Sequence, residues 1–492
     1  SSMALRFSQT IPAVVLLILS IVGIILLVLP AKEYGIVLDA GSSHTSMYIY
    51  KWPANKQNGT GIVTQHSECH AKGGGISSYA GVRGGAAESL KVCLEQAVKD
   101  IPKSRHHQTP LYLGATAGMR LLKTVNATES DRVLKEVKQK MRSYPFSFKE
   151  ATILSGSAEG AYGWVTVNYL NENFAKVETI GALDLGGAST QITFETSVKV
   201  EDSSEMMELT LYGQVYRVYT HSFLCYGQDQ FLRRLTAHLI KTQGVTPHIN
   251  HPCYPKQFNM SIKLGKDVFN SPCTQSYRPA QFDPQMSVMV VGTGDYHSCQ
   301  GNVQKIFSFD NCSYSKCSFD RVFQPSVRGQ FMAFSAYFFT HKYISHLSNI
   351  PITSPSQMEA AIQLVCNMTI SEVLSHSSEP KQPEKYMKKV CAVSNFVQVL
   401  LMQGYGFNEL SFPSISFQEK AGGASVGWAL GYMLILSNMV PAESSVLMKA
   451  LPSGPWAGIL FLFIALLLFG VGYLLITIRN TRNKEVIIVQ VL

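Results

Sequence analysis

Gly35-Ile-Val-Leu-Asp39-Ala-Gly-Ser-Ser-His44-Thr45 has a near copy later in the chain, Gly181-Ala-Leu-Asp184-Leu-Gly-Gly-Ala-Ser-Thr190. Each stretch is a short apolar run followed by Asp-x-Gly, then by small and hydroxyl residues, then by a β-rich run. This order predicts a strand, a tight turn and a returning strand in both places. Two ordinary hairpins that share glycine and serine are the simpler alternative, but the aspartates stand in register in both copies.

The composition of the two turns suits a phosphate ligand. Glycine lets a backbone approach a ligand closely, and clustered N–H and O–H groups bind phosphate oxygens. Two such hairpins can face each other across one polyphosphate. Asp39 and Asp184 are then expected to hold a divalent cation, because hard cations take carboxylate and water oxygens.

Two apolar segments are long enough to cross a bilayer. Residues 11–29 form a run of 19 residues and residues 456–478 a run of 23, near the length of about 20 that spans a hydrocarbon core. A signal peptide is the alternative for the first run, which is long for one and lacks a clear A-x-A site. Basic residues follow the second run from Arg479 onward, which favours a cytoplasmic C-terminus. We therefore expect two spans, with residues 1–10 and 479–492 inside the cell and one large domain outside.

The cysteines and the glycosylation sequons also favour an extracellular domain. All ten cysteines lie between Cys69 and Cys391 without a C-x-x-C motif, and an even number predicts disulfides in an oxidising compartment. The formal charge of +9 comes without a basic run or an Arg-rich helix, so no nucleic acid is expected as a partner. The part between the apolar runs holds five N-x-[ST] sequons, expected as glycosylation sites: Asn58, Asn126, Asn259, Asn311 and Asn367.

The rest of the chain alternates strands with helices. The two aspartates are 145 residues apart, too far for a solenoid repeat, so the duplication implies two related α/β domains. Residues 247–326 have a loop-rich composition and hold five of the cysteines. A strand with a turn and helix start is expected at 111–120, a strand at 151–156, and helices at 86–99, 159–169, 229–241, 329–346, 358–367 and 426–435.

One acidic residue stands at a predicted junction between a strand and a helix. Glu159, in Gly156-Ser-Ala-Glu-Gly160, begins the helix, whose N-terminus favours an ionised carboxylate. Beside a phosphate site it can take a proton from an attacking water; an ordinary helix-start residue is the simpler interpretation. Gly114-Ala-Thr116-Ala-Gly118 is a second small-residue turn, suited to a phosphate contact or to close packing. The sequence lacks the P-loop, H-E-x-x-H and Rossmann motifs, which disfavours those classes.

Five stretches resemble, in order, the signature regions of the ecto-nucleoside triphosphate diphosphohydrolases, the CD39 family. The likeness runs from about residue 34 to residue 441, and Gly-Gly-Gly-Ile-Ser-Ser-Tyr79 is most like the type 2, ecto-ATPase branch. The resemblance implies an α/β, actin/hexokinase-like fold with a nucleotide cleft between two RNase H-like domains and a transmembrane helix at each end. The implied domains are 34–165 and 166–425, with 426–450 returning to the first. The five stretches contain, in chain order, Asp39, Gly114, Glu159, Asp184 and Gly427.

The resemblance also implies an activity at the plasma membrane. Such enzymes remove the terminal phosphate from extracellular nucleotides with Ca²⁺ or Mg²⁺, taking ATP to ADP and on to AMP, and so control purinergic signalling. Carried over by position, the general base and the two residues that orient the attacking water are Glu159, Ser189 and Gln191. The metal's water shell is held by Asp39 and Asp184, with Trp428 nearby. The phosphates are lined by Ser42, Ser43, His44, Thr116, Gly186, Gly187, Ala188 and Ser189.

The resemblance carries further expectations and two departures. The family stacks the base between two aromatic side chains; Phe339 supplies one, but Val390 stands where the other is expected, so Tyr386 is the alternative. The loop at 171–180 is shorter than in surface relatives, which puts membrane contact by that loop in doubt. Homo-oligomers through the transmembrane helices are also expected. The implied bridges are Cys69–Cys93, Cys225–Cys273, Cys253–Cys299, Cys312–Cys317 and Cys366–Cys391.

Two other functions fit the same fold. A phosphotransferase would move the phosphate to an acceptor, but the apolar runs, sequons and cysteines disfavour a cytosolic kinase. An inactive surface receptor would bind nucleotides without hydrolysis, and the intact Glu159, Ser189 and Gln191 disfavour it.

Overall fold

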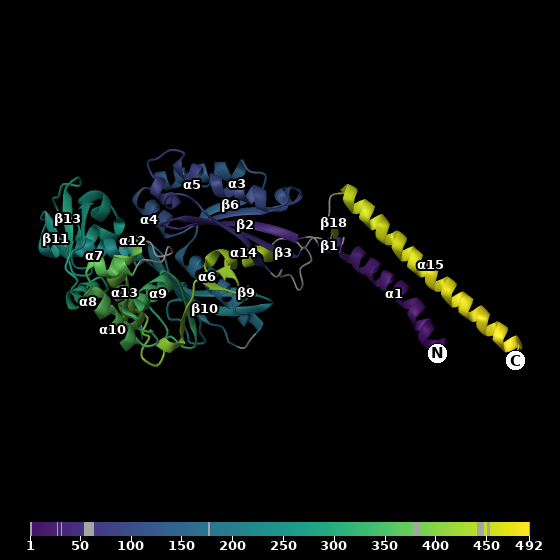
Figure 1. The fold of residues 1–492 in the computed structure, drawn as a ribbon. Coiled ribbons are helices and arrows are strands. Elements are labelled where there is room, and N and C mark those ends of the chain that lie inside the picture. The colour runs from purple at the N-terminus through teal and green to yellow at the C-terminus, as the bar shows by residue number, and fades with distance from the viewer. Residues whose placement is uncertain are drawn as a thin grey trace. The chain divides into compact units, whose positions relative to one another are not determined.

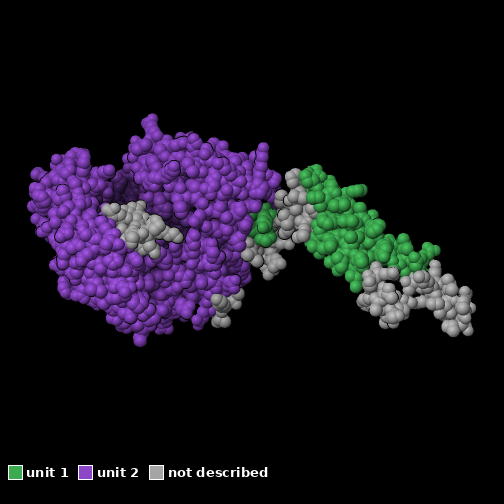
Figure 2. Space-filling view, viewed as in Figure 1, with its two compact units in different colours: residues 1–33, 52–62, 441–492 green, residues 34–51, 63–440 purple. Residues whose placement is uncertain are grey.

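The computed structural model of the protein describes residues 2–26, 28–30, 32–53, 63–175, 178–376, 384–439, 447–449 and 453–491. The chain divides into two compact units (Figure 2): residues 1–33, 52–62 and 441–492 form the first, and residues 34–51 and 63–440 form the second. Both Asp hairpins belong to the second unit. The sequon at Asn58 lies outside the described residues, and the other four sequon asparagines are exposed.

The first Asp hairpin lies in a five-stranded sheet with the order β4-β3-β2-β5-β6 (Figure 1). β2 runs parallel to β5, and β5 runs parallel to β6, while β3 and β4 are antiparallel. Asp39 lies one residue before the end of β2. The strands are β2 Lys32–Ala40, β3 Thr45–Pro53, β4 Thr64–His70, β5 Pro110–Ala115 and β6 Ser147–Ile153.

The second Asp hairpin lies in a six-stranded sheet with the order β15-β14-β7-β8-β10-β9. β7 is antiparallel to β8 and parallel to β14, which is in turn parallel to β15. In both sheets the first hairpin strand therefore pairs with its returning strand on one side and with a later parallel strand on the other, and that strand pairs in turn with a second parallel strand. The two predicted hairpins are confirmed. The strands are β7 Gly181–Leu185, β8 Ser189–Glu195, β9 Met206–Leu211, β10 Gln214–Leu224, β14 Phe331–Ser335 and β15 Ile415–Phe417.

Helices pack around these sheets, and α6 lies between the six-stranded sheet and α14. α6 packs against β7, β8 and β10 and against α14. The approach of α14 is close, because a Cβ on Gly431 would lie 2.0 Å from the carbonyl oxygen of Tyr162. The main helices are α2 Gly85–Ser89, α3 Lys91–Asp100, α4 Ala117–Val125, α5 Ala127–Arg142, α6 Gly156–Leu170, α7 Gln228–Gln243, α8 Tyr296–Gln304, α9 Ala336–Ser348, α10 Pro355–Cys366, α11 Ile370–Ser375, α12 Glu384–Met387, α13 Val390–Val399 and α14 Trp428–Met439.

The prediction of one helix over residues 329–346 is wrong. Phe331–Ser335 is the strand β14, buried between β7 and β15, and the helix α9 begins only at Ala336. A short apolar run fits a buried parallel strand as well as a buried helix, so periodicity does not separate the two. The helix expected at 86–99 is interrupted at Leu90, which separates α2 from α3.

Residues 247–326 contain more regular structure than their composition suggests. They include α8 and a three-stranded sheet with the order β11-β13-β12. The strands are β11 His248–His251, β12 Asn259–Lys263 and β13 Ser287–Gly292. The five bridges join the pairs that the resemblance implies: Cys69–Cys93, Cys225–Cys273, Cys253–Cys299, Cys312–Cys317 and Cys366–Cys391.

The first unit contains two helices, α1 Ser2–Leu26 and α15 Ser453–Val491. Among the described residues one stretch, Gly454–Asn480, is long and apolar enough to cross a membrane. The two-span prediction is thus supported for one span only. The apolar part of α1, Ile11–Ile25, has 15 residues, which reach roughly 22 Å at 1.5 Å per residue, short of a core of about 30 Å. Gly470 lies against Leu17, where the two helices pack together.

Candidate active site

One cavity of about 440 Å³ in the second unit gathers most of the predicted site residues. Gln191 lies behind its wall, where it is buried and bonds to residues that line it. The lining includes Asp39, Ser42, Ser43, His44, Thr116, Glu159, Asp184, Gly186, Gly187, Ala188, Ser189, Phe339, Tyr386 and Trp428.

The two glycine-rich turns approach each other at this cavity. A Cβ on Gly187 would lie 2.6 Å from Ser42 Oγ, so the two turns are in close contact here. Gly118 at the start of α4 is equally constrained, because its Cβ would lie 2.8 Å from the Ser42 Cα. Both turns and the start of α4 therefore lie close together at one cavity, and clustered backbone N–H groups of this kind suit phosphate oxygens.

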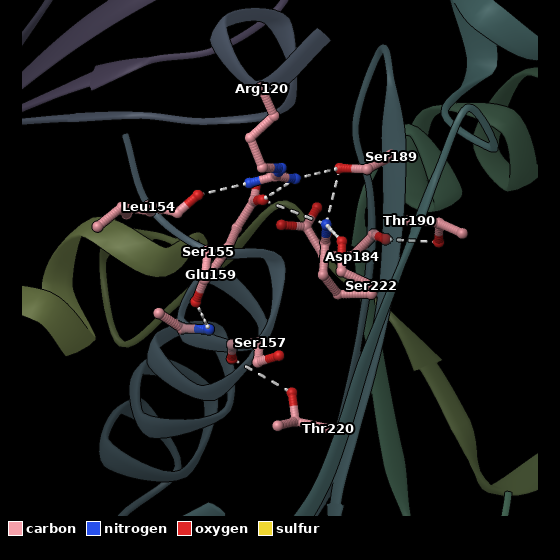
Figure 3. Close-up of polar contacts among 12 residues, drawn as sticks. Arg120, Leu154, Ser155, Ser157, Glu159, Asp184, Ser189, Thr190, Thr220 and Ser222 are labelled. Carbon is pink, nitrogen blue, oxygen red and sulfur yellow. Dashed lines mark hydrogen bonds and ion pairs between the residues drawn. The ribbon is translucent and has the colours of Figure 1, made fainter. Parts of the chain in front are cut away.

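Glu159 lies in the first turn of α6 and is buried at the centre of a polar network (Figure 3). Its Oε2 accepts hydrogen bonds from Arg120 Nη2 at 2.9 Å and from Gln191 Nε2 at 3.2 Å. Arg120 Nη2 also donates to Ser189 Oγ at 3.1 Å, and its Nη1 donates to the carbonyl of Leu154 at 3.0 Å. These bonds fix the carboxylate at the wall of the cavity.

Gln191 connects Glu159 to the second hairpin. Its Nε2 lies 2.8 Å from both Ser189 Oγ and Ser222 Oγ. Its Oε1 is buried and has no hydrogen-bond partner among the described residues. A buried acceptor without a partner is costly, so Oε1 is suited to accept a hydrogen bond from a bound water.

Three carboxylates face this cavity, and burial raises the pKa of each. Burial raises the pKa of Asp184 to about 7, with the Glu159 charge adding to the effect and a hydrogen bond with Ser335 opposing it. Burial also raises the pKa of Asp39 well above its ordinary value, with Glu159 and Asp184 adding and a hydrogen bond with Trp428 opposing. For Glu159, burial raises the pKa and Arg120 lowers it.

Residues 29–449 match the profile of the GDA1/CD39 (nucleoside phosphatase) family. The chain belongs to this family. It is 48% identical over 504 aligned residues to the ectonucleoside triphosphate diphosphohydrolase 2 of Homo sapiens, covering 99% of this chain and 100% of the relative. The corresponding protein of Gallus gallus is 45% identical, with 96% and 99% covered.

A solved structure agrees on the fold. The nucleoside triphosphate hydrolase structure from Neospora caninum superposes with a TM-score of 0.61 at 16% identity, covering 84% of this chain and 93% of the other. At this identity the likeness concerns the mixed α/β fold alone.

The residues of this family member fit a divalent cation held through water. The carboxylates of Asp39, Asp184 and Glu159 line one cavity. Burial and then repulsion from neighbouring carboxylates raise the pKa values of Asp39 and Asp184, and a cation would offset both effects. Among the described residues, no group of three carboxylate or imidazole ligand atoms lies within 4.8 Å of one another there. A cation at this place would therefore take most of its oxygen ligands from water and phosphate.

Trp428 has a role beyond lying near the aspartates. It is buried, begins α14 and makes the hydrogen bond with Asp39. A Cβ on Gly114 would lie 2.4 Å from the Trp428 ring. Gly114 therefore makes room for the indole, which fixes the first aspartate of this family member.

Arg120 is the functional residue that the sequence reasoning missed. It stands two residues after the small-residue turn Gly114–Gly118. It forms the ion pair with Glu159 at 2.9 Å. Its side chain is largely buried and serves both Glu159 and Ser189. An arginine inside a signature stretch was the available signal, but its partner was 39 residues away.

The part of the cavity lined by α9, α12 and the start of α13 is mostly aromatic and is called the aromatic end below. Phe339, Tyr343, Tyr386 and Val390 line it, and the Phe339 and Tyr343 rings stack with centroids 6.2 Å apart. Val390 is 3% exposed and presents an aliphatic side chain. The structure thus places two of the expected base-binding candidates, Phe339 and Tyr386, on the same cavity as the phosphate turns.

Proposed function

We propose that this protein hydrolyses the terminal phosphate of extracellular nucleoside triphosphates. The observation that supports this function most directly is the Glu159 carboxylate, held by Arg120 and Gln191 at a cavity flanked by two Asp-Gly turns. The turns suit a polyphosphate, the carboxylate suits an attacking water, and the aromatic end suits a base. Family membership supports the same reaction class.

Glu159 acts as the general base in this proposal. The hydrogen bonds described for its carboxylate fall on Oε2, so Oε1 is the atom that takes the proton from the water. Gln191 Oε1 accepts a hydrogen bond from that water, and Ser189 Oγ lies beside it, 2.8 Å from Gln191 Nε2. The water then attacks the terminal phosphorus in one displacement. The bond from that phosphorus to the bridging oxygen breaks as the new P–O bond forms, so inorganic phosphate and the nucleoside diphosphate leave and no covalent intermediate forms.

The phosphates lie between the two turns. Gly187 and Ala188 offer backbone N–H groups on one side, while the Gly186 N–H holds the turn by donating to the Ser189 carbonyl at 3.0 Å. Ser42, Ser43 and His44 line the other side, with Thr116 at the start of α4. Donors placed before the reaction offset the charge that develops in the transition state without reorganisation.

Ca²⁺ or Mg²⁺ is the proposed cofactor. When bound, such a cation would offset the negative charge of the phosphates. Asp39 and Asp184 hold its water shell, and Trp428 and Ser335 keep the two carboxylates in place.

The domain organisation and the topology complete the proposal. The two sheets are the cores of two RNase H-like domains of an actin/hexokinase-like fold, at 34–165 and 166–425. α15 crosses the plasma membrane, and α1 crosses it with its whole length, since its 25 residues extend about 37 Å although the apolar part alone is shorter than the hydrocarbon core. Both termini are then cytoplasmic and the cavity faces the extracellular space.

The test measures phosphate release from ATP by intact cells expressing the full chain, with and without EDTA. We expect release of phosphate that EDTA abolishes. Phosphate transferred to an acceptor without free phosphate would support a phosphotransferase, and nucleotide binding without turnover would support a receptor. Tags at both termini should stay inaccessible to antibody until the cells are permeabilised.

A further inference from the structure

Lys389 brings a positive charge to the cavity between its aromatic end and its phosphate turns. It is the residue just before α13, next to Val390, and it lines the cavity with Phe339 and Tyr386. Among the described lining residues, Lys389 and Lys420 are the two with a lysine or arginine side chain. Lys420 lies 3.9 Å from Glu68, which also belongs to the lining.

The partner of Lys389 is Asp229, which lies directly behind the second turn. Lys389 Nζ is 3.6 Å from Asp229 Oδ1. Asp229 is in the first turn of α7, and its backbone N–H donates to the carbonyl of Gly187 at 2.9 Å. A Cβ on Gly187 would lie 2.9 Å from Asp229 Oδ2. The ion pair therefore connects the base end of the cavity to the phosphate turn.

The charges at this point favour a ligand-dependent role. A carboxylate beside a polyphosphate repels it, and Lys389 offsets that repulsion. A lysine ammonium has three donors on a flexible stem, so it can leave Asp229 or bridge from it to a phosphate oxygen. We propose that Lys389 is a further nucleotide-binding residue, which bonds a phosphate oxygen of the nucleotide on the base side of the terminal phosphate, and that Asp229 restrains it until the nucleotide binds. This inference rests on the proposed function.

If the Lys389–Asp229 ion pair only stabilises the fold, substitutions are expected to change KM differently than if Lys389 binds the nucleotide. Two variants distinguish these alternatives. Lys389→Met removes the charge and keeps the length, while Asp229→Asn frees the lysine and removes the repelling carboxylate. With Lys389 on the phosphate, Lys389→Met should raise KM for ATP about tenfold with kcat little changed, as expected for losing a hydrogen bond to a charged group. Asp229→Asn should instead lower KM. If the pair only stabilises the fold, both variants should shift KM in the same direction.

Matched variants and a binding measurement complete the test. Lys388→Met is the control, because the neighbouring Lys388 lies over the Phe258 ring and does not line the cavity; its KM should equal that of the wild type. Lys389→Arg should restore most of the affinity, and Lys389→Gln replaces the Met variant if that fails to fold. Calorimetric titration of ATP into Glu159→Gln protein, with and without Lys389→Met, should show the same loss without turnover.

The outcomes keep this inference apart from the proposed function. If the wild type releases phosphate from ATP while Lys389→Met has an unchanged KM and an unchanged Kd, the inference is wrong and the function stands. If the wild type releases no phosphate, the function is wrong. A common rise in KM for Lys389→Met and Asp229→Asn would make the pair structural.

Discussion

The two Asp hairpins have the same sequence pattern and the same topology, but different surroundings. The first turn is open, with Ser43 and His44 exposed. The second turn is buried from Gly187 to Ser189 and rests on α7, because a Cβ on Gly227 would lie 2.2 Å from the Ala188 nitrogen. The duplicated motif thus lines the same cavity with one exposed turn and one buried turn.

The difference continues along the returning strands. Thr190 Oγ1 donates to the Asp184 carbonyl at 2.7 Å, whereas the Oγ1 of its counterpart Thr45 has no partner among the described residues. Gln191 bonds to Glu159, but its counterpart Ser46 bonds to His70 at 2.8 Å. The second hairpin is therefore the one that hydrogen-bonds to Glu159, and the first brings its aspartate and turn to the cavity.

The largest expected effect comes from Glu159. Among the described residues, Gln191 of the second hairpin hydrogen-bonds to it, and the counterpart in the first hairpin does not. Glu159→Gln should lower kcat for ATP about 10²–10⁴-fold, the usual contribution of a general base, while ATP still binds because the turns are intact. The measurement is steady-state phosphate release together with calorimetric binding. Glu150→Gln, on the exposed part of β6, is the control. Turnover within a few-fold of the wild type would remove Glu159 from the mechanism.

Truncating each of the two counterparts, Gln191 and Ser46, in turn tests the asymmetry between the hairpins directly. Gln191→Ala removes the contacts to Glu159 and to the water, and should lower kcat roughly 10- to 100-fold, as for losing a hydrogen bond to a charged group. Ser46→Ala removes a bond to His70 and should change kcat little. Equal losses in the two variants would show that both hairpins serve the base, contrary to the geometry.

Arg120 sharpens the comparison through pH. Its charge lowers the pKa of Glu159 against the effect of burial, and a base must be deprotonated to work. Arg120→Ala should therefore raise that pKa and move the acid limb of the kcat/KM profile to higher pH. Arg120→Lys, which keeps the charge, should move it less. An acid limb that stays in place in Arg120→Ala would mean that another group controls it.

The smallest expected effect lies at the aromatic end, away from both hairpins. Val390→Tyr adds a ring opposite Phe339 and should lower KM for ATP about fivefold, at the lower end of the roughly 1–3 kcal/mol for base stacking. Binding that is equal in ground and transition states leaves kcat unchanged. The measurement is KM for ATP in the variant and in the wild type. An unchanged KM would indicate that Tyr386 already stacks on the base.

Much of the fold was predictable because its signals are local. The hairpins, the helix at Glu159 and the spacing of the copies follow from periodicity and turn residues. β14 was not predictable, because Phe331–Ser335 is a short apolar run whose burial between β7 and β15 makes it a strand. The apolar run at the N-terminus was overestimated because composition does not tell where a helix ends, and α1 ends at Leu26.

The sequence by itself determined which chemical groups the site has: two aspartates in Asp-x-Gly turns, a carboxylate at a helix start, and cysteines that form five bridges. Residue type and local spacing are enough for that. Only the tertiary structure decided which groups act together. Arg120 meets Glu159, and Lys389 meets Asp229, 160 residues away, because strands and helices distant in the chain end at the same cavity.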